Sequence, residues 1–299
     1  MKTKVSIIIV NYNSEQTIGR CIDSVYKHVS GVTYEIIVVD NASAPASVSF
    51  IKKNYPDVTL LENRENEGFG AANNRGAKHA SGDYLFFLNP DTILLDDALL
   101  SFCQFLEEEM PHAVSCGGNL IKETGEATTA YGNFPTVFQE WSLMGFHRFY
   151  KKYYEERLRI GKTCGNLTAP QEVPFIVGAD IFIKKPVFQE SGGFDENFFL
   201  YYEETDLFYR LSRKGYHSYI LPQVKIIHLE GPSLLKNEKL NLEKWVIWEK
   251  SKYYYFRKNK GRLAALFVKG VQLFSLILHR FFGAKAYPLR KTLKITWKA

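Results

Sequence analysis

The residues with the clearest chemical potential are three carboxylates close together in the chain, Glu203, Glu204 and Asp206. Carboxylates this close repel one another, and the repulsion raises the pKa of at least one of them. A carboxylate with a raised pKa can take a proton from a hydroxyl group near neutral pH. Because residues 205–215 have the pattern of a helix that ends at a glycine, favourable charge at a helix N-terminus is an alternative interpretation.

Two further carboxylates follow apolar segments. Asp40 ends the run 34–40, and Asp91 comes shortly after the run 84–88. Such unbroken β-branched and aromatic runs are typical of buried strands, where an unpaired charge is costly. In open α/β sheets, ligands bind beyond the carboxyl ends of strands, so both carboxylates are candidate binding groups. Each one alone also fits a helix cap or a turn.

Strand and helix patterns alternate along the first part of the chain. Strands are expected at 5–10, 34–40, 58–61 and 84–88, and helices at 17–28, 47–54, 70–80 and 97–110. This alternation predicts an α/β fold with a mixed, mainly parallel central sheet flanked by helices. Farther along, strands are expected at 175–183 and 224–229 and a helix at 205–215, while 146–159 is expected to be a basic, aromatic helix or a mobile segment.

Six segments in a fixed order carry a resemblance to a known family. They are VSIIIVNYNS (5–14), EIIVVDNAS (35–43), NEGFGAANNRG (66–76), LFFLNPDT (85–92), GGFDENFFLYYEETDLFYR (192–210) and HLEGPS (228–233). Together they resemble glycosyltransferase family 2, in particular its rhamnosyltransferase-like bacterial members, over roughly residues 4–235.

The resemblance implies a GT-A fold and an inverting sugar transfer. Its nucleotide-binding half would be 1–115 and its acceptor-binding half 116–235, followed by a basic helical tail at 236–299. The donor would be dTDP-rhamnose or a UDP-sugar. The acceptor would be a hydroxyl of a saccharide or a lipid-linked or cell-surface polysaccharide precursor.

By this resemblance, Asp40 would accept hydrogen bonds from the base or ribose, and the ring of Tyr12 would stack on the base. The stretch 66–76 would bring backbone N–H groups to the diphosphate, which Arg75 could neutralise unless it is a surface residue. Gly178 and Ala179 would floor the sugar pocket. The residues expected to bind the nucleotide sugar are Asn11, Tyr12, Asn13, Asp40, Asn66, Gly68, Asn73, Arg75, Asn89, Asp91, Gly178 and Ala179.

Metal binding and catalysis are implied in the same way. Asn89-Pro90-Asp91 occupies the place of the family's D-x-D motif, with Asn in the first position. Asp91 and His228 would ligate Mg²⁺ or Mn²⁺, whose charge helps the diphosphate leave. In the family's E-D-x-D-L pattern the second acid is the base. That position is Glu204, with Glu203 and Asp206 orienting the acceptor or an arginine. One base and no enzyme nucleophile implies inversion.

The charge of the chain is unevenly distributed. Of its 38 Lys and Arg residues, 12 lie in 251–299, which has no Asp or Glu, so the first 250 residues hold 26 basic and 32 acidic residues. A basic tail is typical of chains that bind a polyanion. The acidic body and the lack of a nucleic-acid motif argue against nucleic acid.

The apolar segment 263–282 is interrupted by Lys269 and Arg280, which makes it a poor spanning helix. It fits better as an interfacial helix on an anionic membrane, with a helix packed on the domain as the alternative.

The cellular location follows from cysteine spacing and from the N-terminus. Four widely spaced cysteines without a C-x-x-C pair argue against a disulfide framework or a zinc site. The apolar run 5–10 is too short for a signal peptide. We therefore expect a cytoplasmic protein that is peripheral on the inner face of the cytoplasmic membrane.

Two other functions are weighed. A sugar-1-phosphate nucleotidyltransferase would need a Gly-rich loop with Arg and Lys after the first strand, where this chain has Asn-Tyr-Asn-Ser. A non-catalytic nucleotide-sugar-binding module would be favoured by a replaced acidic cluster, but the cluster is present.

Overall fold

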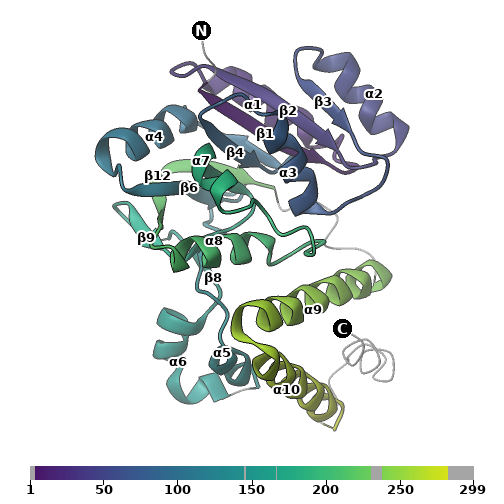
Figure 1. The fold of residues 1–299 in the computed structure, drawn as a ribbon, viewed down its shortest axis with the longest axis vertical. Coiled ribbons are helices and arrows are strands. Elements are labelled where there is room, and N and C mark those ends of the chain that lie inside the picture. The colour runs from purple at the N-terminus through teal and green to yellow at the C-terminus, as the bar shows by residue number, and fades with distance from the viewer. Residues whose placement is uncertain (1–3, 145, 166, 230–237, 282–299) are drawn as a thin grey trace. The chain divides into compact units, whose positions relative to one another are not determined.

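The structure is a computed structural model that describes residues 4–144, 146–165, 167–229 and 238–281 (Figure 1). The chain forms two compact units that interleave along the sequence. Within the described residues, unit 1 comprises 4–132, 161–197 and 203–229, and unit 2 comprises 133–160, 198–202 and 238–281. The segments that build one unit therefore come from distant parts of the chain.

Unit 1 is built on a mixed sheet with the strand order β3-β2-β1-β4-β11-β6-β12-β5, and β9 pairs with β12. The first four strands in this order are parallel, β11 is antiparallel to β4 and β6, and β12 is parallel to β6 and antiparallel to β5 and β9. Their bounds are β1 (Val5–Asn11), β2 (Tyr34–Asp40), β3 (Thr59–Glu62), β4 (Tyr84–Leu88), β5 (Thr92–Leu94), β6 (Ala113–Ile121), β9 (Gln171–Val173), β11 (Asp180–Lys184) and β12 (His217–His228).

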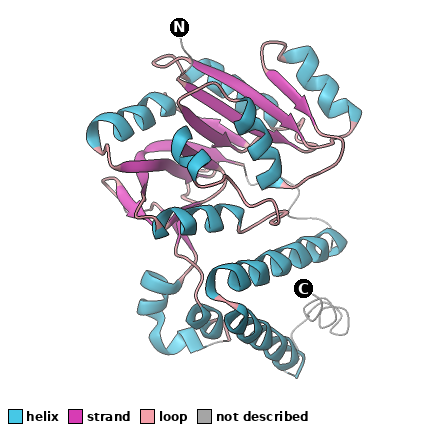
Figure 2. Cartoon of the chain, viewed as in Figure 1, coloured by secondary structure: helices cyan, strands magenta, loops and turns pink. Residues whose placement is uncertain are grey.

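A smaller sheet and several helices complete unit 1. The second sheet has the order β10-β7-β8, formed by Phe175–Ile176, Thr129–Gly132 and Gly161–Thr163. Figure 2 shows helices flanking the larger sheet. They are α1 (Ile18–His28), α2 (Pro45–Asn54), α3 (Phe69–His79), α4 (Ala98–Gln104), which continues as the π-helical turn η1 (Phe105–Glu109), α7 (Lys185–Glu190) and α8 (Glu203–Arg213).

The core of unit 1 explains why its central strands lack alternation. All seven residues of β1 are buried, so its Val and Ile side chains pack on both faces of the sheet. Phe87 and Phe194 lie 5.1 Å apart between ring centres, and Phe86 and Phe102 lie 5.7 Å apart. These aromatic pairs join the strands to the helix and loop layers around them.

The strand β12 changes register part way along. Leu221 pairs with Gly118 of β6, and Lys225 pairs with the next residue, Asn119, so residues 222–224 form a bulge that contains a proline. Beyond the bulge, Ile226–His228 pair with β5, and His228 lies opposite Thr92.

Unit 2 is helical. It contains α5 (Val137–Ser142), η2 (Phe146–Tyr150), α6 (Lys151–Tyr153), η3 (Tyr154–Leu158), α9 (Glu238–Lys260) and α10 (Arg262–Phe281), and α10 packs against both α9 and α5. Lys252 is buried in its core, where Nζ lies 3.0 Å from Glu249 Oε1 and 3.6 Å from Glu140 Oε2. No helix in the described part of the chain is long and apolar enough to cross a membrane.

The predicted fold class is confirmed, as a mixed sheet flanked by helices and followed by a C-terminal helical extension. The predicted strands 34–40 and 84–88 have the observed bounds. The single strand expected at 175–183 is instead two strands in different sheets, β10 and β11. The expected helix or mobile segment at 146–159 is a series of three short helical segments.

The bounds of the compact units differ from the predicted functional division at 115 and 235, because 133–160 and 198–202 belong with the C-terminal helices. The division into nucleotide-binding and acceptor-binding halves stays a prediction.

Candidate active site

Asparagine or aspartate stands at the carboxyl end of each of the four parallel strands. Asn11 and Asp40 are the last residues of β1 and β2, while Asn63 and Asn89 directly follow β3 and β4. Because these strands are parallel neighbours, the four residues lie at one edge of the sheet. This edge is called the polar edge below, and it also includes Asn41, which follows Asp40.

Asp40 is buried at the polar edge and is held by its neighbours. Asn11 Nδ2 donates to Asp40 Oδ1 at 2.7 Å, and the N–H of Ser43 donates to Oδ2 at 3.0 Å. Each carboxylate oxygen can accept a second hydrogen bond, so Asp40 keeps capacity for a ligand.

The loops that follow β1 and β2 are tied to each other. The N–H of Asn13 donates to Ser43 Oγ at 2.9 Å, and the N–H of Ala44 donates to Asn13 Oδ1 at 2.8 Å. Asn13 and Ala42 have positive φ angles of 53° and 61°, which are costly for residues other than glycine. Beside them the ring of Tyr12 is 52% exposed and is open to stacking.

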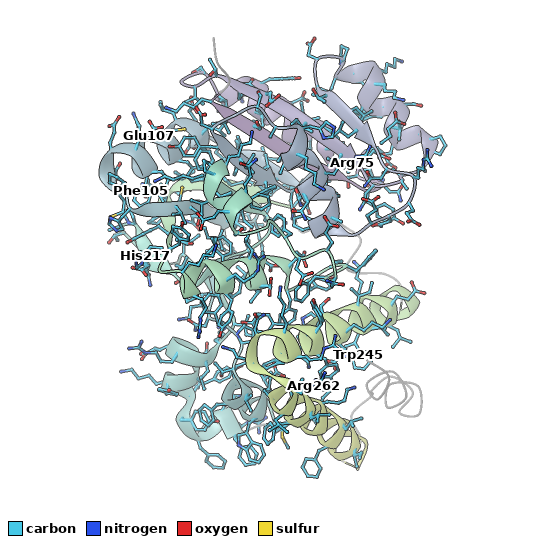
Figure 3. All side chains as sticks on the ribbon, viewed as in Figure 1. Arg75, Phe105, Glu107, His217, Trp245 and Arg262 are labelled. Atoms are coloured by element: carbon cyan, nitrogen blue, oxygen red, sulfur yellow. The ribbon has the colours of Figure 1, made fainter. Side chains whose placement is uncertain are left out.

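A second set of amides shapes the loop before α3. Asn41 Nδ2 donates to Asn66 Oδ1 at 2.8 Å, and Asn63 Nδ2 donates to Asn41 Oδ1 at 2.9 Å. Arg75 on α3, labelled in Figure 3, donates to Asn63 Oδ1. Gly68 caps the helix with a φ of 89°, which favours glycine. These side chains therefore fix the loop that leads into α3.

Asn41 and Asn63 were missed by the sequence analysis. The signal that could have found them is their position, since each directly follows a strand, as Asn89 does. Asn73, which was predicted to bind the donor, is buried and its Nδ2 donates to Phe69 O at 3.1 Å within α3.

The predicted metal ligands lie side by side. Asp91 Oδ1 is 3.4 Å from His228 Nε2, and each side chain is 19% exposed. The pairing of β5 with β12 produces this contact, and the N–H of Leu229 donates to Asp91 O at 2.9 Å. Asn89 is held nearby, because its N–H donates to Ala179 O at 2.9 Å.

The pair of Asp91 and His228 fits a divalent cation that is shared with a diphosphate. A carboxylate and an imidazole are both suitable ligands, and Mg²⁺ is commonly bound by one or two protein groups together with substrate phosphates. No group of three or more His, Cys, Asp or Glu side chains forms a metal site within the described ranges. A cation at this pair would therefore take its other ligands from substrate and water.

The three carboxylates of the acidic cluster, at the start of α8, differ in how far they are exposed. Glu203 and Asp206 are buried, and Glu204 is half-buried. Asp206 Oδ2 accepts from Arg210 Nε at 2.8 Å, and Arg210 Nη2 donates to Gly193 O at 2.6 Å. Asp206 thus binds the arginine that ties α8 to the preceding turn.

The pKa values of both glutamates are raised by burial. Burial raises the pKa of Glu204 to about 7, against the opposing effect of the N–H groups of Glu204 and Thr205. The pKa of Glu203 is raised well above its usual value, mainly by burial and to a smaller extent by repulsion from Glu204. Among the described residues, no group is within hydrogen-bond reach of Glu203 Oε2. Both shifts favour the neutral carboxyl, and with a pKa of about 7 Glu204 can accept and release a proton near neutral pH.

The acidic cluster is packed against α3. A Cβ atom at Gly70 would lie 3.5 Å from Glu203 Cβ and 3.0 Å from Phe194 Cβ, so the backbone of α3 approaches both. Asn74 bonds Phe194 twice, with Nδ2 donating to Phe194 O at 2.8 Å and Oδ1 accepting from the Phe194 N–H at 2.9 Å. Asn74 was not predicted as a site residue, and no sequence pattern distinguishes it from Asn73.

The residues predicted to floor the sugar pocket, Gly178 and Ala179, lie next to the first turn of α3 and to Asn89. A Cβ atom at Gly178 would lie 3.4 Å from the ring of Phe69, in the first turn of α3, and Ala179 O holds Asn89. The next residue, Asp180, is fully buried, and its Oδ2 accepts from the N–H of Gly118 at 2.5 Å. Burial raises the pKa of Asp180 well above its usual value.

Curated relatives give similar sequences over different extents. The chain is 38% identical over 110 residues to a poly(ribitol-phosphate) β-glucosyltransferase from Bacillus spizizenii, which covers 35% of this chain and 17% of that protein. It is 25% identical over 220 residues to an N-acetylglucosaminyl-diphospho-decaprenol L-rhamnosyltransferase from Mycobacterium tuberculosis, covering 66% of this chain and 67% of the relative. It is also 25% identical over 236 residues to rhamnosyltransferase WbbL of Escherichia coli, covering 75% and 83%.

A solved structure supports the fold. A mannosyltransferase from Pyrobaculum calidifontis, in complex with GDP-Man and Mn²⁺, superposes with a TM-score of 0.57 and 15% identity, over 99% of this chain and 85% of that one. The profile of glycosyl transferase family 2 matches residues 6–192. With the strand order, the polar edge and the acidic cluster already described, this match shows that the chain belongs to glycosyl transferase family 2.

Proposed function

We propose that the chain transfers a sugar from a nucleotide-sugar donor to an acceptor hydroxyl with inversion at the anomeric carbon. The observation that carries this proposal is Glu204, a half-buried carboxylate at the start of α8 whose pKa is raised to about 7. A base of this kind holds its proton weakly enough to accept and release one at neutral pH.

The donor is expected to bind along the polar edge. Asp40 would accept from the base or ribose, with Asn11 and Asn13 holding its loop and Tyr12 stacking on the base. The first turn of α3, with Asn66 and Gly68 before it, would direct N–H groups at the diphosphate. The donor is proposed to be dTDP-rhamnose or a UDP-sugar. The name of the mycobacterial relative, an L-rhamnosyltransferase, favours rhamnose as the sugar.

Asp91 and His228 would hold Mg²⁺ or Mn²⁺. When bound, such a cation neutralises charge on the leaving diphosphate. Asn89, beside this pair, would contact the ribose.

Glu204 would take the proton from the acceptor hydroxyl as its oxygen bonds to the anomeric carbon. The bond from that carbon to the diphosphate breaks in the same step, and the inverted product follows because no protein nucleophile takes part. Glu203 would position the acceptor. Asp206 would act through Arg210, and Gly178 and Ala179 would support the pocket floor.

The acceptor is proposed to be a lipid-linked or cell-surface polysaccharide precursor. The mycobacterial relative supports this, because its name is that of a rhamnosyltransferase that acts on an N-acetylglucosaminyl-diphospho-decaprenol. A lipid-linked acceptor would suit an enzyme that is cytoplasmic and peripheral on the inner face of the cytoplasmic membrane, where the basic segment 251–299 would meet anionic lipid.

The test is release of nucleoside diphosphate from a panel of nucleotide sugars, with Mg²⁺ or Mn²⁺ and with E204Q as the control. Release from one donor that is lost with EDTA and in E204Q supports the proposal and identifies the donor. If no donor gives release, calorimetry decides the matter. Metal-dependent donor binding keeps the enzyme hypothesis and points to a missing acceptor, and absence of binding contradicts it.

A further inference from the structure

The exposed side of α10 is apolar, whereas the exposed side of a helix in a globular unit is normally polar. Leu263 is 84% exposed and Leu266 is 63% exposed, while Phe267 and Phe274 are 46% and 51% exposed. These residues recur at the spacing of one helix face, so they form a stripe along one side of α10, with exposed Gly270 between Phe267 and Phe274. Val268, on another side of the helix, is fully buried.

A second group of exposed rings adjoins this stripe. On α5, Trp141 stacks on Phe146 of η2 with ring centres 4.9 Å apart, and it lies 6.3 Å from Phe267 of α10. Phe149 of η2 is 87% exposed. The stripe and these rings together are called the apolar face of unit 2.

Exposed apolar side chains are concentrated in unit 2. Of the fifteen large apolar side chains that are exposed among the described residues, only Tyr12, Tyr26 and Leu95 lie in unit 1. Scattered exposed residues are normal on a protein surface, but exposed rings that join one another from α10 through Trp141 to η2 indicate an interaction site.

The charges around the apolar face are basic. Arg262 begins α10, as Figure 3 shows, and Arg148 and Lys151 lie in or next to η2, all three with exposed side chains. The sequence of α10 has no Asp or Glu. The exposed glutamates of η3, Glu155 and Glu156, form ion pairs with Arg159 and Lys152 on either side of it.

We propose that the apolar face of unit 2 docks on an anionic lipid bilayer and lies in its interface. Aromatic and leucine side chains with a basic rim match such a surface, in which apolar groups enter the acyl boundary and cations meet phosphate. A second copy of the chain fits less well, because a symmetric contact through this face would bring two basic rims together. The inference adds α5 and η2 to the basic tail. It rests on the proposed function in one respect only, namely that docking on the bilayer would bring the enzyme to a lipid-linked acceptor.

The experiment is sedimentation of the full chain with vesicles of phosphatidylcholine alone and of phosphatidylcholine mixed equally with phosphatidylglycerol. Point variants of the full chain are used because Tyr255 and Phe256 of α9 belong to the core of unit 2, so deletion of the tail would remove that core. L263S/L266S and F149S remove the most exposed parts of the face, and R148E/R262E reverses part of the rim. Y26S replaces an apolar side chain of unit 1 that is 44% exposed and is the matched control.

The wild type and Y26S should sediment with the anionic vesicles. L263S/L266S should bind about tenfold or more weakly, F149S should bind more weakly, and R148E/R262E should lose the preference for anionic lipid. Circular dichroism establishes that each variant is folded. No binding by the wild type overturns the proposal, as does unchanged binding by both apolar variants. A dimer that L263S/L266S separates, without lipid binding by the wild type, would assign the face to a second copy instead. Because no sugar transfer is measured, failure here is distinct from failure of the donor test.

Discussion

Glu204 sets the pH range in which the proposed reaction can run. A general base works only when deprotonated, so with a pKa of about 7 the rate should fall as the pH drops below neutrality. An ordinary glutamate, with a pKa near 4.3, would place this fall about two to three units lower. The pH profile of kcat/KM for diphosphate release measures the position of the acid limb.

E203Q and E204Q separate the two glutamates. Because burial raises the pKa of Glu203 well above its usual value and so favours its neutral form, an uncharged glutamine should be tolerated there, and E203Q should keep most of the activity and the acid limb. E204Q should lose about 10²-fold to 10⁴-fold, the usual contribution of a general base. If E203Q were the inactive variant and E204Q the active one, the assignment of the base would be reversed.

Asp180 should make the fold less stable as the pH rises. Its folded pKa lies above the unfolded value of about 3.9, so the native state binds more protons in that window. Stability is therefore greatest below the unfolded pKa and falls by up to about 1.4 kcal/mol per pH unit until the folded pKa is passed. D180N mimics the protonated form, so in urea unfolding its stability relative to the wild type should increase as the pH rises above about 4.

The control for D180N is D57N, at an exposed residue after α2. D57N should track the wild type across this range. A stability difference between D180N and the wild type that stays constant with pH would show that Asp180 does not titrate in this way.

At the scale of elements, the turn that follows α7 is fixed by two consecutive glycines with positive φ, Gly192 and Gly193. A Cβ atom at Gly193 would lie 2.6 Å from Asn74 Oδ1, whereas one at Gly192 would meet nothing within 4 Å. Alanine at either position strains the backbone, by roughly 1–2 kcal/mol. G193A should cost about twice as much as G192A, because it also displaces the Asn74 bonds to Phe194.

Denaturant midpoints of the two glycine variants, at equal m-values, test this difference. N74A in the G193A background should add little further loss, because the two changes remove the same contact. Equal midpoints for G192A and G193A would mean that the close approach to Asn74 is unimportant.

The elements differ in how far the sequence predicts them. β4 is apolar throughout and β2 contains the apolar run 36–39, and the bounds of both strands were predicted correctly. β6 was missed because Ser115, Gly117 and Gly118 interrupt its pattern, yet the structure needs those glycines, since a Cβ atom at Gly118 would lie 2.8 Å from Val224 O. The approach of Asp91 to His228 could be suggested only by resemblance, because it depends on a long-range strand register.

At the scale of the molecule, the interleaving of the units predicts what truncation does. Phe198 packs on Tyr254 with ring centres 4.8 Å apart, and buried Glu140 lies 3.6 Å from Lys252. A chain that ends at residue 231 loses these partners, so residues 133–160 should unfold locally. Limited trypsin digestion should then cut after Arg157 much faster than in the full chain.

Cleavage after Lys53, on α2 of unit 1, provides the internal reference for this digestion. Its rate should be the same in both chains. Equal rates after Arg157 in the two chains would show that 133–160 folds without the C-terminal helices.

The bulge in β12, residues 222–224, should tolerate a change in chain length better than the stretch 225–228 that follows it. A residue lost from 222–224 would come from a stretch already outside the regular ladder, so the pairing of His228 with Thr92 could persist. A residue lost between Lys225 and His228 would shift the pairing by one and turn the imidazole to the opposite face, away from Asp91. Insertions and deletions in natural variants should therefore gather at the bulge and spare the three residues that follow Lys225.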